Sequence, residues 1–279
     1  NIALAQFTLP TNQLPNLNMK PVLTMAADPT TPLPNSVMII TSSLSGITNV
    51  GNSDFTWFVN GVKQKEASGP NKGVFTLPTG GIGSVYKVAV SVSTPGGDNL
   101  SDAMSFTVSD FDLTWSASSQ APAFYKGKLL PTQNSTLNIS ALPFIYWPGA
   151  KTLIAANNLS YNWYIDDKFL AGGSGIGKQD LVFAATDYAG AGKSIRLEIR
   201  TSDGAVSISK GIEIPIARPQ VLVRLADSGT GFPYGAALKN LTAAPMSLNF
   251  AAQNYFFNAA PGDLRWQWLI DGKEVGRIS

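Results

Sequence analysis

The side chains that carry out most enzyme chemistry are absent from this sequence. Its 279 residues include no cysteine and no histidine. The chain therefore has no thiolate nucleophile, no disulfide, no imidazole base and no cysteine- or histidine-ligated metal. A Ser-His-Asp or Cys-His mechanism is excluded within this chain. An enzyme built from it would have to use carboxylates, lysine, tyrosine or a Ser-Lys pair.

The remaining groups form no recognisable catalytic pattern. The Gly-rich stretches at 80–83 and 172–177 precede predicted strands rather than helices, so they are not phosphate loops. Isolated aspartates in turns usually bond their own backbone, and none lies in an EF-hand loop. A carboxylate pair for glycoside hydrolysis stays open, because nothing singles out one pair. We predict no enzyme, catalytic residue, cofactor or metal site. The turn aspartates considered as calcium ligands are Asp98, Asp166, Asp167, Asp203 and Asp227.

Composition narrows the class of protein. The net charge is only +2 and no basic run occurs, so no nucleic-acid partner is expected. Charged residues make up 14% of the chain, well below the roughly 25% of an average domain. A polar but weakly charged surface is typical of exported β-proteins. No apolar run approaches the roughly 18 residues that span a bilayer, so we expect no membrane span within this chain.

Three similar segments reveal an internal repeat. Each carries a tryptophan followed by two residues and then Asn-Gly, Asp-Asp or Asp-Gly, and the tryptophans stand 106 and 105 residues apart. A period near 105 matches one small β-sandwich per repeat. We interpret the tryptophans as core anchors between two sheets rather than as rings that stack on a ligand. They are Trp57, Trp163 and Trp268.

Apolar residues alternate along several segments, which predicts strands with one buried face. Asn60-Gly61 and Asp271-Gly272 favour two-residue hairpin turns, because these residues tolerate positive φ. No segment of ten or more residues shows a clean helical period, so helix should be nearly absent. The predicted strands include Val37–Ile40, Phe55–Val59, Tyr86–Val92, Leu137–Ala141, Ile195–Ile199 and Met246–Phe250.

The repeat sets the expected domain boundaries. Residues 1–19 form an extended lead-in, and the sandwiches are predicted at 20–110, 111–217 and 218–279. The joins are short and are not Gly/Ser-rich linkers. We therefore expect immunoglobulin-like sandwiches arranged end to end as a stiff rod.

Aromatic residues cluster in the second and third repeats. They lie at Phe144, Tyr146 and Trp147, and at Tyr255, Phe256 and Phe257. Such rings could stack on sugars as an interaction surface. Alternatively, they cover the end of a sandwich and the junction between domains. Both interpretations stay open at this point.

The third repeat is predicted to be incomplete within this chain, because few residues follow Trp268. Either the natural chain continues past Ser279 or another chain supplies the missing strand. The second alternative has one supporting feature, an apolar lead-in that belongs to no repeat. Added to the next molecule as a donor strand, it would build a filament from head-to-tail contacts. The donor residues would be Ile2, Leu4, Phe7 and Leu9.

The tryptophan motif resembles that of polycystic-kidney-disease-type (PKD) and related immunoglobulin-like sandwiches, which carry Trp and an Asp/Asn-Gly hairpin on the third strand. The tandem pattern is similar to exported proteins of candidate-phylum bacteria. The resemblance implies a non-enzymatic structural or adhesion protein, extracellular or in the cell envelope. Its partners would be other cell-surface proteins, copies of itself, or glycans. The alternative is a carbohydrate-binding or accessory module of a larger exported enzyme.

Overall fold

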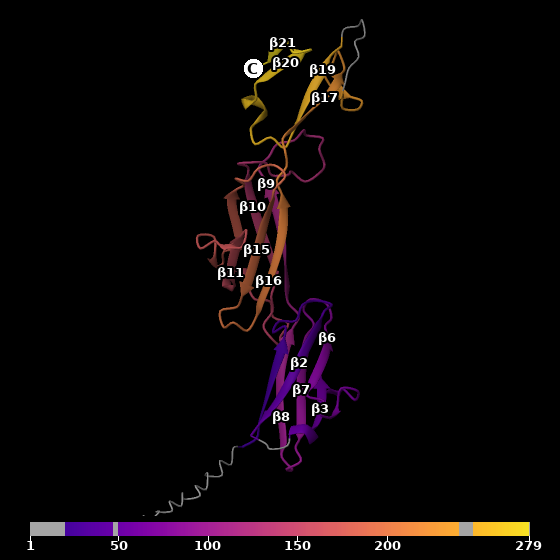
Figure 1. Ribbon diagram of the computed structural model, residues 1–279, viewed down its shortest axis with the longest axis vertical. Helices are drawn as coiled ribbons and strands as arrows, with labels where there is room; N and C mark the ends of the chain where they lie inside the picture. Colours follow the sequence, from indigo (N-terminus) through magenta and orange to yellow (C-terminus); the bar gives the residue numbers. More distant parts are fainter. Residues whose placement is uncertain (1–19, 47–49, 240–247, 279) are drawn as a thin grey trace, which may run out of the picture. The chain divides into compact units, whose positions relative to one another are not determined.

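The computed structural model describes residues 20–46, 50–239 and 248–278. Strands dominate this part of the chain, as Figure 1 shows, and it contains no α-helix. The described residues therefore include no helix that is long and apolar enough to cross a membrane. The all-β prediction is confirmed. The described residues also contain three short 3-10 turns, at Val50–Asn52, Ala156–Asn158 and Pro261–Asp263.

The chain divides into two compact units. The first comprises the residues up to Val108 together with Trp147–Lys151, and the second comprises Ser109–Tyr146 and the residues from Thr152 onward. The short stretch Trp147–Lys151 therefore belongs to the first unit although its neighbours in sequence belong to the second.

The first unit is a β-sandwich of antiparallel strands. One sheet has the order β1-β2-β6, and the other has the order β4-β3-β7-β8 with the short β5 paired to β3. The strands of the first sheet are β1 (Val22–Asp28), β2 (Val37–Ser45) and β6 (Val74–Pro78). Those of the second are β3 (Asp54–Val59), β4 (Val62–Lys63), β5 (Gly69–Pro70), β7 (Val85–Ser93) and β8 (Asn99–Thr107).

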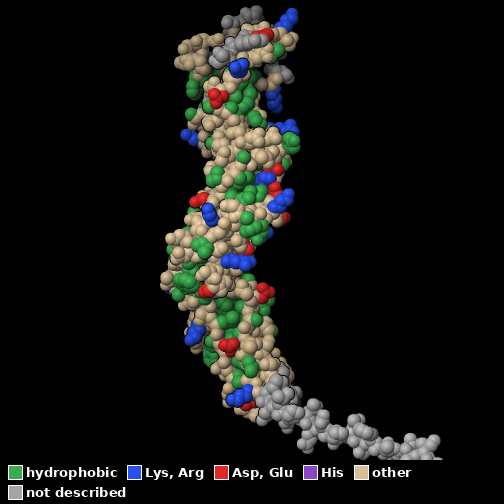
Figure 2. Space-filling model, turned by 90° about the vertical axis from the view of Figure 1, so that its left-hand side faces the viewer, with side chains coloured by type: hydrophobic (Ala, Val, Ile, Leu, Met, Phe, Trp, Pro, Cys, Tyr) green, Lys and Arg blue, Asp and Glu red, His purple; other side chains and the backbone are tan. Residues whose placement is uncertain are grey.

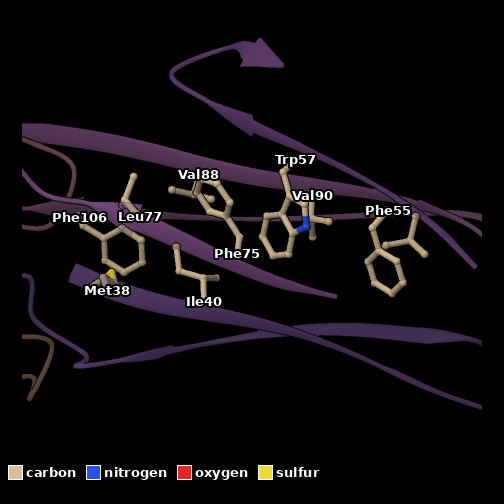
Figure 3. Packing of buried hydrophobic residues seen from close by; sticks show 10 residues of the cluster. Met38, Ile40, Phe55, Trp57, Phe75, Leu77, Val88, Val90 and Phe106 are labelled. Carbon is tan, nitrogen blue, oxygen red and sulfur yellow. The ribbon is translucent and has the colours of Figure 1, made fainter. Parts of the chain in front are cut away.

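The core of this sandwich comes from the alternation seen in the sequence. Strand β2 buries every second residue, including Met38 and Ile40, because successive side chains point to opposite faces. Trp57 lies among these residues, and its ring stacks on Phe75 with 5.4 Å between centroids (Figure 3). The buried cluster is Met38, Ile40, Phe55, Trp57, Phe75, Leu77, Val88, Val90, Val92 and Phe106.

The second unit begins with a sandwich built in the same way. Its sheets have the orders β14-β10-β9 and β12-β11-β15-β16, with β13 paired to β11. The register is also repeated, since Trp57 is opposite Val90 and Trp163 is opposite Leu197. The strands are β9 (Asp110–Ala117), β10 (Thr136–Phe144), β11 (Ser160–Ile165), β12 (Lys168–Phe169), β13 (Gly175–Ile176), β14 (Asp180–Ala184), β15 (Gly192–Arg200) and β16 (Ser207–Pro215).

The residues after 217 form two further sheets within the second unit. One has the order β18-β17-β19 and the other pairs β20 with β21. Among the described residues of this region, only Ala226 and Gln253 are buried. The strands are β17 (Gln220–Ala226), β18 (Pro233–Tyr234), β19 (Phe250–Tyr255), β20 (Trp266–Ile270) and β21 (Lys273–Ile278).

One strand prediction needs correction. The sequence pattern placed a strand at Met246–Phe250. Residues 246 and 247 lie outside the described residues, residues 248 and 249 are not in a strand, and β19 begins at Phe250 and ends at Tyr255. The cause is the pairing with β17, which runs from Leu225 opposite Phe250 to Gln220 opposite Tyr255. Backbone pairing over six residues thus extends the strand into a segment interpreted as an aromatic patch.

The hairpin turns form where they were predicted. Both turn residues have positive φ in each of the three repeats, as a type I′ turn requires. The φ values are 49° and 81° at Asn60-Gly61, 48° and 59° at Asp166-Asp167, and 49° and 75° at Asp271-Gly272.

Candidate functional site

The repeated tryptophan is held by a loop that follows it in sequence. Trp57 is fully buried, and its indole Nε1 donates a 2.8 Å hydrogen bond to the Lys72 carbonyl. Its backbone N–H donates to Ser68 Oγ at 3.0 Å, and that hydroxyl donates to the Gln64 carbonyl at 2.6 Å. The loop is therefore tied both to the ring and to the strand that carries it.

The second sandwich repeats this arrangement. The Nε1 of the buried Trp163 donates to the Lys178 carbonyl at 2.8 Å. Its backbone N–H donates to Ser174 Oγ at 2.9 Å, and Ser174 donates to the Leu170 carbonyl at 2.7 Å. In both sandwiches the serine stands 11 residues and the lysine 15 residues after the tryptophan. We call this set of contacts the indole lock.

The indole lock leaves neither the polar atom nor the faces of the tryptophan ring accessible. The only polar atom of each ring is used by the protein's own backbone, and the ring faces lie in the core. These two tryptophans are therefore buried and hydrogen-bonded within their own sandwiches, and their role as core anchors stays a prediction.

Trp268 of the third repeat lies in a different environment. It is partly exposed, and its ring is 6.5 Å from Phe250. Ser279 stands 11 residues later but lies outside the described residues, so the structure places no third indole lock.

The hairpin turn after each tryptophan strand supplies a second repeated contact. Asn60 Oδ1 accepts the backbone N–H of Lys87 at 2.8 Å, and Asp166 Oδ1 accepts that of Ser194 at 3.2 Å. The turn side chain thus fastens the hairpin to the neighbouring strand in both sandwiches.

Lys193 is the most buried charged side chain at this turn. The residue is 7% exposed, and its Nζ lies 2.6 Å from Asp166 Oδ2 and 2.7 Å from Asp187 Oδ2. Burial alone would lower the pKa of Lys193, but hydrogen bonds and charges from the two aspartates outweigh it and raise that pKa. Burial opposes the ionised form of Asp166 too, yet Lys193 and the Ser194 N–H hold its pKa below the usual range.

Other carboxylates with lowered pKa values have local partners. Hydrogen bonds from Thr201 and the Ala205 N–H lower the pKa of Asp203, and bonds from Thr230 and the Gly229 N–H lower that of Asp227. Both aspartates therefore accept hydrogen bonds from donors within their own turns. Within the described residues, no group of three or more acidic side chains could hold a metal ion.

Side chains of one charge form no large patch on the face drawn in Figure 2. Figure 2 shows blue and red side chains scattered over a largely uncharged surface, some of them side by side with a side chain of opposite charge. Glu198 is an example of local pairing: it accepts from Arg200 at 2.5 Å and from Asn162 at 3.4 Å.

The first aromatic group is divided between the two units. Phe144, at the end of β10, is 41% exposed, and Tyr146 pairs with Leu153 in an isolated bridge. Trp147 belongs to the first unit, and its side chain is 42% exposed. Phe144 and Tyr146 thus belong to one compact unit and Trp147 to the other, and an interaction surface formed by the three stays a prediction.

The Trp147–Lys151 segment fits closely against strand β8 of the first unit. Thr107 Oγ1 lies 3.1 Å from the Trp147 carbonyl and 2.9 Å from that of Ala150, as a donor to both. Gly149 has a φ of 74°, and a Cβ there would lie 2.7 Å from Ser105 Cβ. A glycine is therefore required for both conformation and space. Sequence reasoning missed this contact, because its partners are about forty residues apart.

The second aromatic group contacts a loop of the second sandwich. Tyr125 meets Tyr255 and Phe256 edge to face, with centroids 5.8 and 5.6 Å apart. The Gln120 N–H donates to the Phe257 carbonyl at 2.8 Å. A hollow of about 150 Å³ beside them is lined by Gln120–Pro122 and Ala252–Asn254. These aromatics thus contact the loop that contains Gln120 and Tyr125, and an interaction surface at these residues stays a prediction.

The proposed donor residues Ile2, Leu4, Phe7 and Leu9 lie outside the described residues. Donor-strand exchange through them stays a prediction.

Comparisons with known proteins concern fold only. No family model matches the chain, and no curated protein matches it. The fibronectin(III)-like modules of Clostridium thermocellum CbhA are similar over 70% of this chain and 94% of theirs, with 11% identity and a TM-score of 0.33. Three N-terminal domains of the bacteriophage RB49 outer capsid protein Hoc cover 92% of this chain and 80% of theirs, with 12% identity and a TM-score of 0.30.

A third similar structure is the Bacteroides ovatus mixed-linkage glucan utilization locus protein SGBP-B, in complex with a heptasaccharide. It covers 89% of this chain and 64% of its own, with 10% identity and a TM-score of 0.24. Likenesses this distant carry no information about ligand or activity.

Proposed function

We propose that this chain is a non-enzymatic structural or adhesion protein of the bacterial cell surface. The observation that carries the proposal is the indole lock, built with the same offsets around Trp57 and Trp163. In two successive domains, the central aromatic ring and its polar atom stabilise the fold. Repeating such a domain in tandem produces an extended spacer.

The surface composition supports export. Charged residues make up only 14% of the chain, and the net charge is +2. A chain without cysteine forms no disulfides, so its domains depend on their buried cores, and each of the two sandwiches has one. The partners would be other surface proteins or copies of this chain.

Cell fractionation tests this proposal. With an antibody against the chain, we expect the protein in the envelope or the medium, where external protease removes it from intact cells. Retention in the cytosolic fraction, protected from external protease, would contradict the proposal.

Glycan binding is the second candidate, and the exposed ring of Trp147 favours it. Its backbone carbonyl accepts a hydrogen bond from Thr107, and the residue is 42% exposed. An exposed ring on an anchored backbone can stack on a sugar face. We expect saturable glycan binding that Trp147→Ala removes without changing thermal stability. Unchanged binding in this variant, or no binding across a panel of soluble glycans, would exclude this role for Trp147.

A further inference from the structure

Lys193 lies between two carboxylates that come from different segments. Its Nζ is 2.6 Å from Asp166 Oδ2, in the turn after β11, and 2.7 Å from Asp187 Oδ2, in the loop after β14. The lysine side chain is only 8% exposed. The arrangement places an amine in contact with two carboxyl groups, and the amine has little access to water.

The two aspartates are not equivalent. Asp166 is 46% exposed and has a second donor, the Ser194 N–H on its other oxygen. Both partners favour its ionised form. Asp187 is 29% exposed, and its Oδ2, the atom that meets Lys193, is shut off from solvent. Asp187 is therefore the carboxyl group whose reacting oxygen is better shielded from water.

We propose that Lys193 and Asp187 condense to form an isopeptide bond within the second sandwich, with Asp166 carrying the proton. Asp166 takes a proton from the Lys193 ammonium, and the neutral amine attacks Cγ of Asp187. The new bond joins Lys193 Nζ to Asp187 Cγ, and the bond from Cγ to Oδ2 breaks.

The atoms and charges balance without a co-reactant. Two of the three ammonium protons move to Oδ2 of Asp187, one of them by way of Asp166. This oxygen then leaves as water. One hydrogen stays on the amide nitrogen, and Asp166 ends as the carboxylate it was. No atom is oxidised or reduced, and the charges of the ammonium and the Asp187 carboxylate are both removed.

Proximity accelerates the condensation, because well-oriented groups in one molecule react as if at about 10⁵–10⁸ M. The ion pair also limits the rate of condensation, because the raised pKa of Lys193 makes the neutral amine a minor species. The reaction is therefore slow and follows folding.

A second lysine in the same sandwich is a natural comparison. Lys210 Nζ lies 2.6 Å from Asp110 Oδ1, and its side chain is 35% exposed. Within the part of the chain that the structure describes, this is the only ion pair of Lys210. Without a second carboxylate to carry the proton, this pair stays ionic. The chain should lose one water molecule and not two.

Intact-mass spectrometry of the folded full chain, after prolonged incubation and then denaturation, tests the proposal. We expect a mass lower than that of the sequence by one water molecule, and fragmentation that links the peptides containing Asp187 and Lys193. Lys193→Arg, which keeps the positive charge, should restore the full mass. Lys210→Arg should still lose one water.

Two results would overturn the proposal. One is the full sequence mass in the folded wild-type chain. The other is a water loss that persists in Lys193→Arg, which would assign it to cyclisation at an Asp-Gly turn such as Asp271-Gly272. Asp166→Asn tests the proton carrier separately from the reacting pair. It leaves Lys193 and Asp187 in place, and it should slow the loss of water at least tenfold. Circular dichroism checks that each variant is folded, and the wild-type fragmentation needs no variant at all.

Discussion

The indole Nε1 of Trp57 donates a hydrogen bond to the backbone carbonyl of Lys72 at 2.8 Å, and the two residues are 15 positions apart. The same bond, with the same length and offset, joins Trp163 to Lys178. A core aromatic ring thus fixes the loop that crosses the end of its own strand. The repetition of this contact makes it a property of the domain type rather than of one sandwich.

Removing the indole N–H should destabilise each sandwich. Trp57→Phe and Trp163→Phe leave a carbonyl without its donor and lose buried volume, so we expect each to cost about 2–4 kcal/mol. Urea unfolding measures the loss. Trp147→Phe is the matched control, because that ring is 42% exposed, and it should change stability by less than about 0.5 kcal/mol. Equal effects for buried and exposed rings would contradict this role.

The serine of the indole lock should contribute almost as much to the free energy of unfolding as the indole N–H does. Ser68→Ala and Ser174→Ala remove an acceptor for the tryptophan N–H and a donor to a loop carbonyl, at an expected cost of about 1–3 kcal/mol. Ser101→Ala and Ser209→Ala serve as controls, since both residues are exposed on edge strands. If the two pairs of variants unfold at the same urea concentration, the serine contacts contribute nothing to stability.

Gly149→Ala should release the segment 147–151 from strand β8. The variant adds strain at a φ of 74° and a close contact with Ser105 Cβ. Gly97→Ala is the matched control, because Gly97 has a φ of 87° and nothing within 4 Å of an added Cβ. We expect faster tryptic cleavage after Lys151 in Gly149→Ala alone, and partial rescue by Ser105→Gly. Cleavage at the wild-type rate would show that the close fit is unimportant.

The phenol of Tyr161 should make the second sandwich sensitive to alkali. Burial and the negative charge of Asp180 raise its pKa to about 12, from an ordinary value of about 10. The folded state therefore holds the proton more tightly than the unfolded state. Its stabilising contribution is complete below about pH 10 and is lost as the pH rises to about 12.

Tyr161→Phe removes this titration together with the hydroxyl's 3.0 Å bond to the Ala156 carbonyl. Its stability should be lower near neutral pH and flatter above about pH 10. Urea unfolding of both proteins across this pH range measures the difference. A wild-type curve parallel to that of the variant would exclude Tyr161 as the cause.

Much of the fold could be predicted because its signals are local and periodic. Alternating apolar residues marked β2, β7 and β15, and the Asn60-Gly61 turn fixed the hairpin that follows Trp57. The 105–106 residue spacing of the tryptophans then identified the repeated domain. Each of these signals depends on neighbours a few residues apart, which is why single-sequence reasoning found them.

The indole lock itself was missed because its serine and lysine lie in irregular loops without a period. Its signal was nevertheless present, since Ser68 and Ser174 share one offset from their tryptophans. The docking of Trp147–Lys151 had no such signal. It depends on Thr107 and Ser105, about forty residues away, and only the folded chain brings them together.

Hydrogen exchange of the tryptophan indoles, followed by NMR, tests most directly the claim that the repeated tryptophans are structural anchors. The account predicts that, of the six tryptophans, Trp57 and Trp163 have strongly protected Nε1 hydrogens that exchange only when their sandwich unfolds. Trp147 should exchange rapidly. Rapid exchange of both buried indoles in the native protein, or their protection only after a glycan is added, would contradict the account.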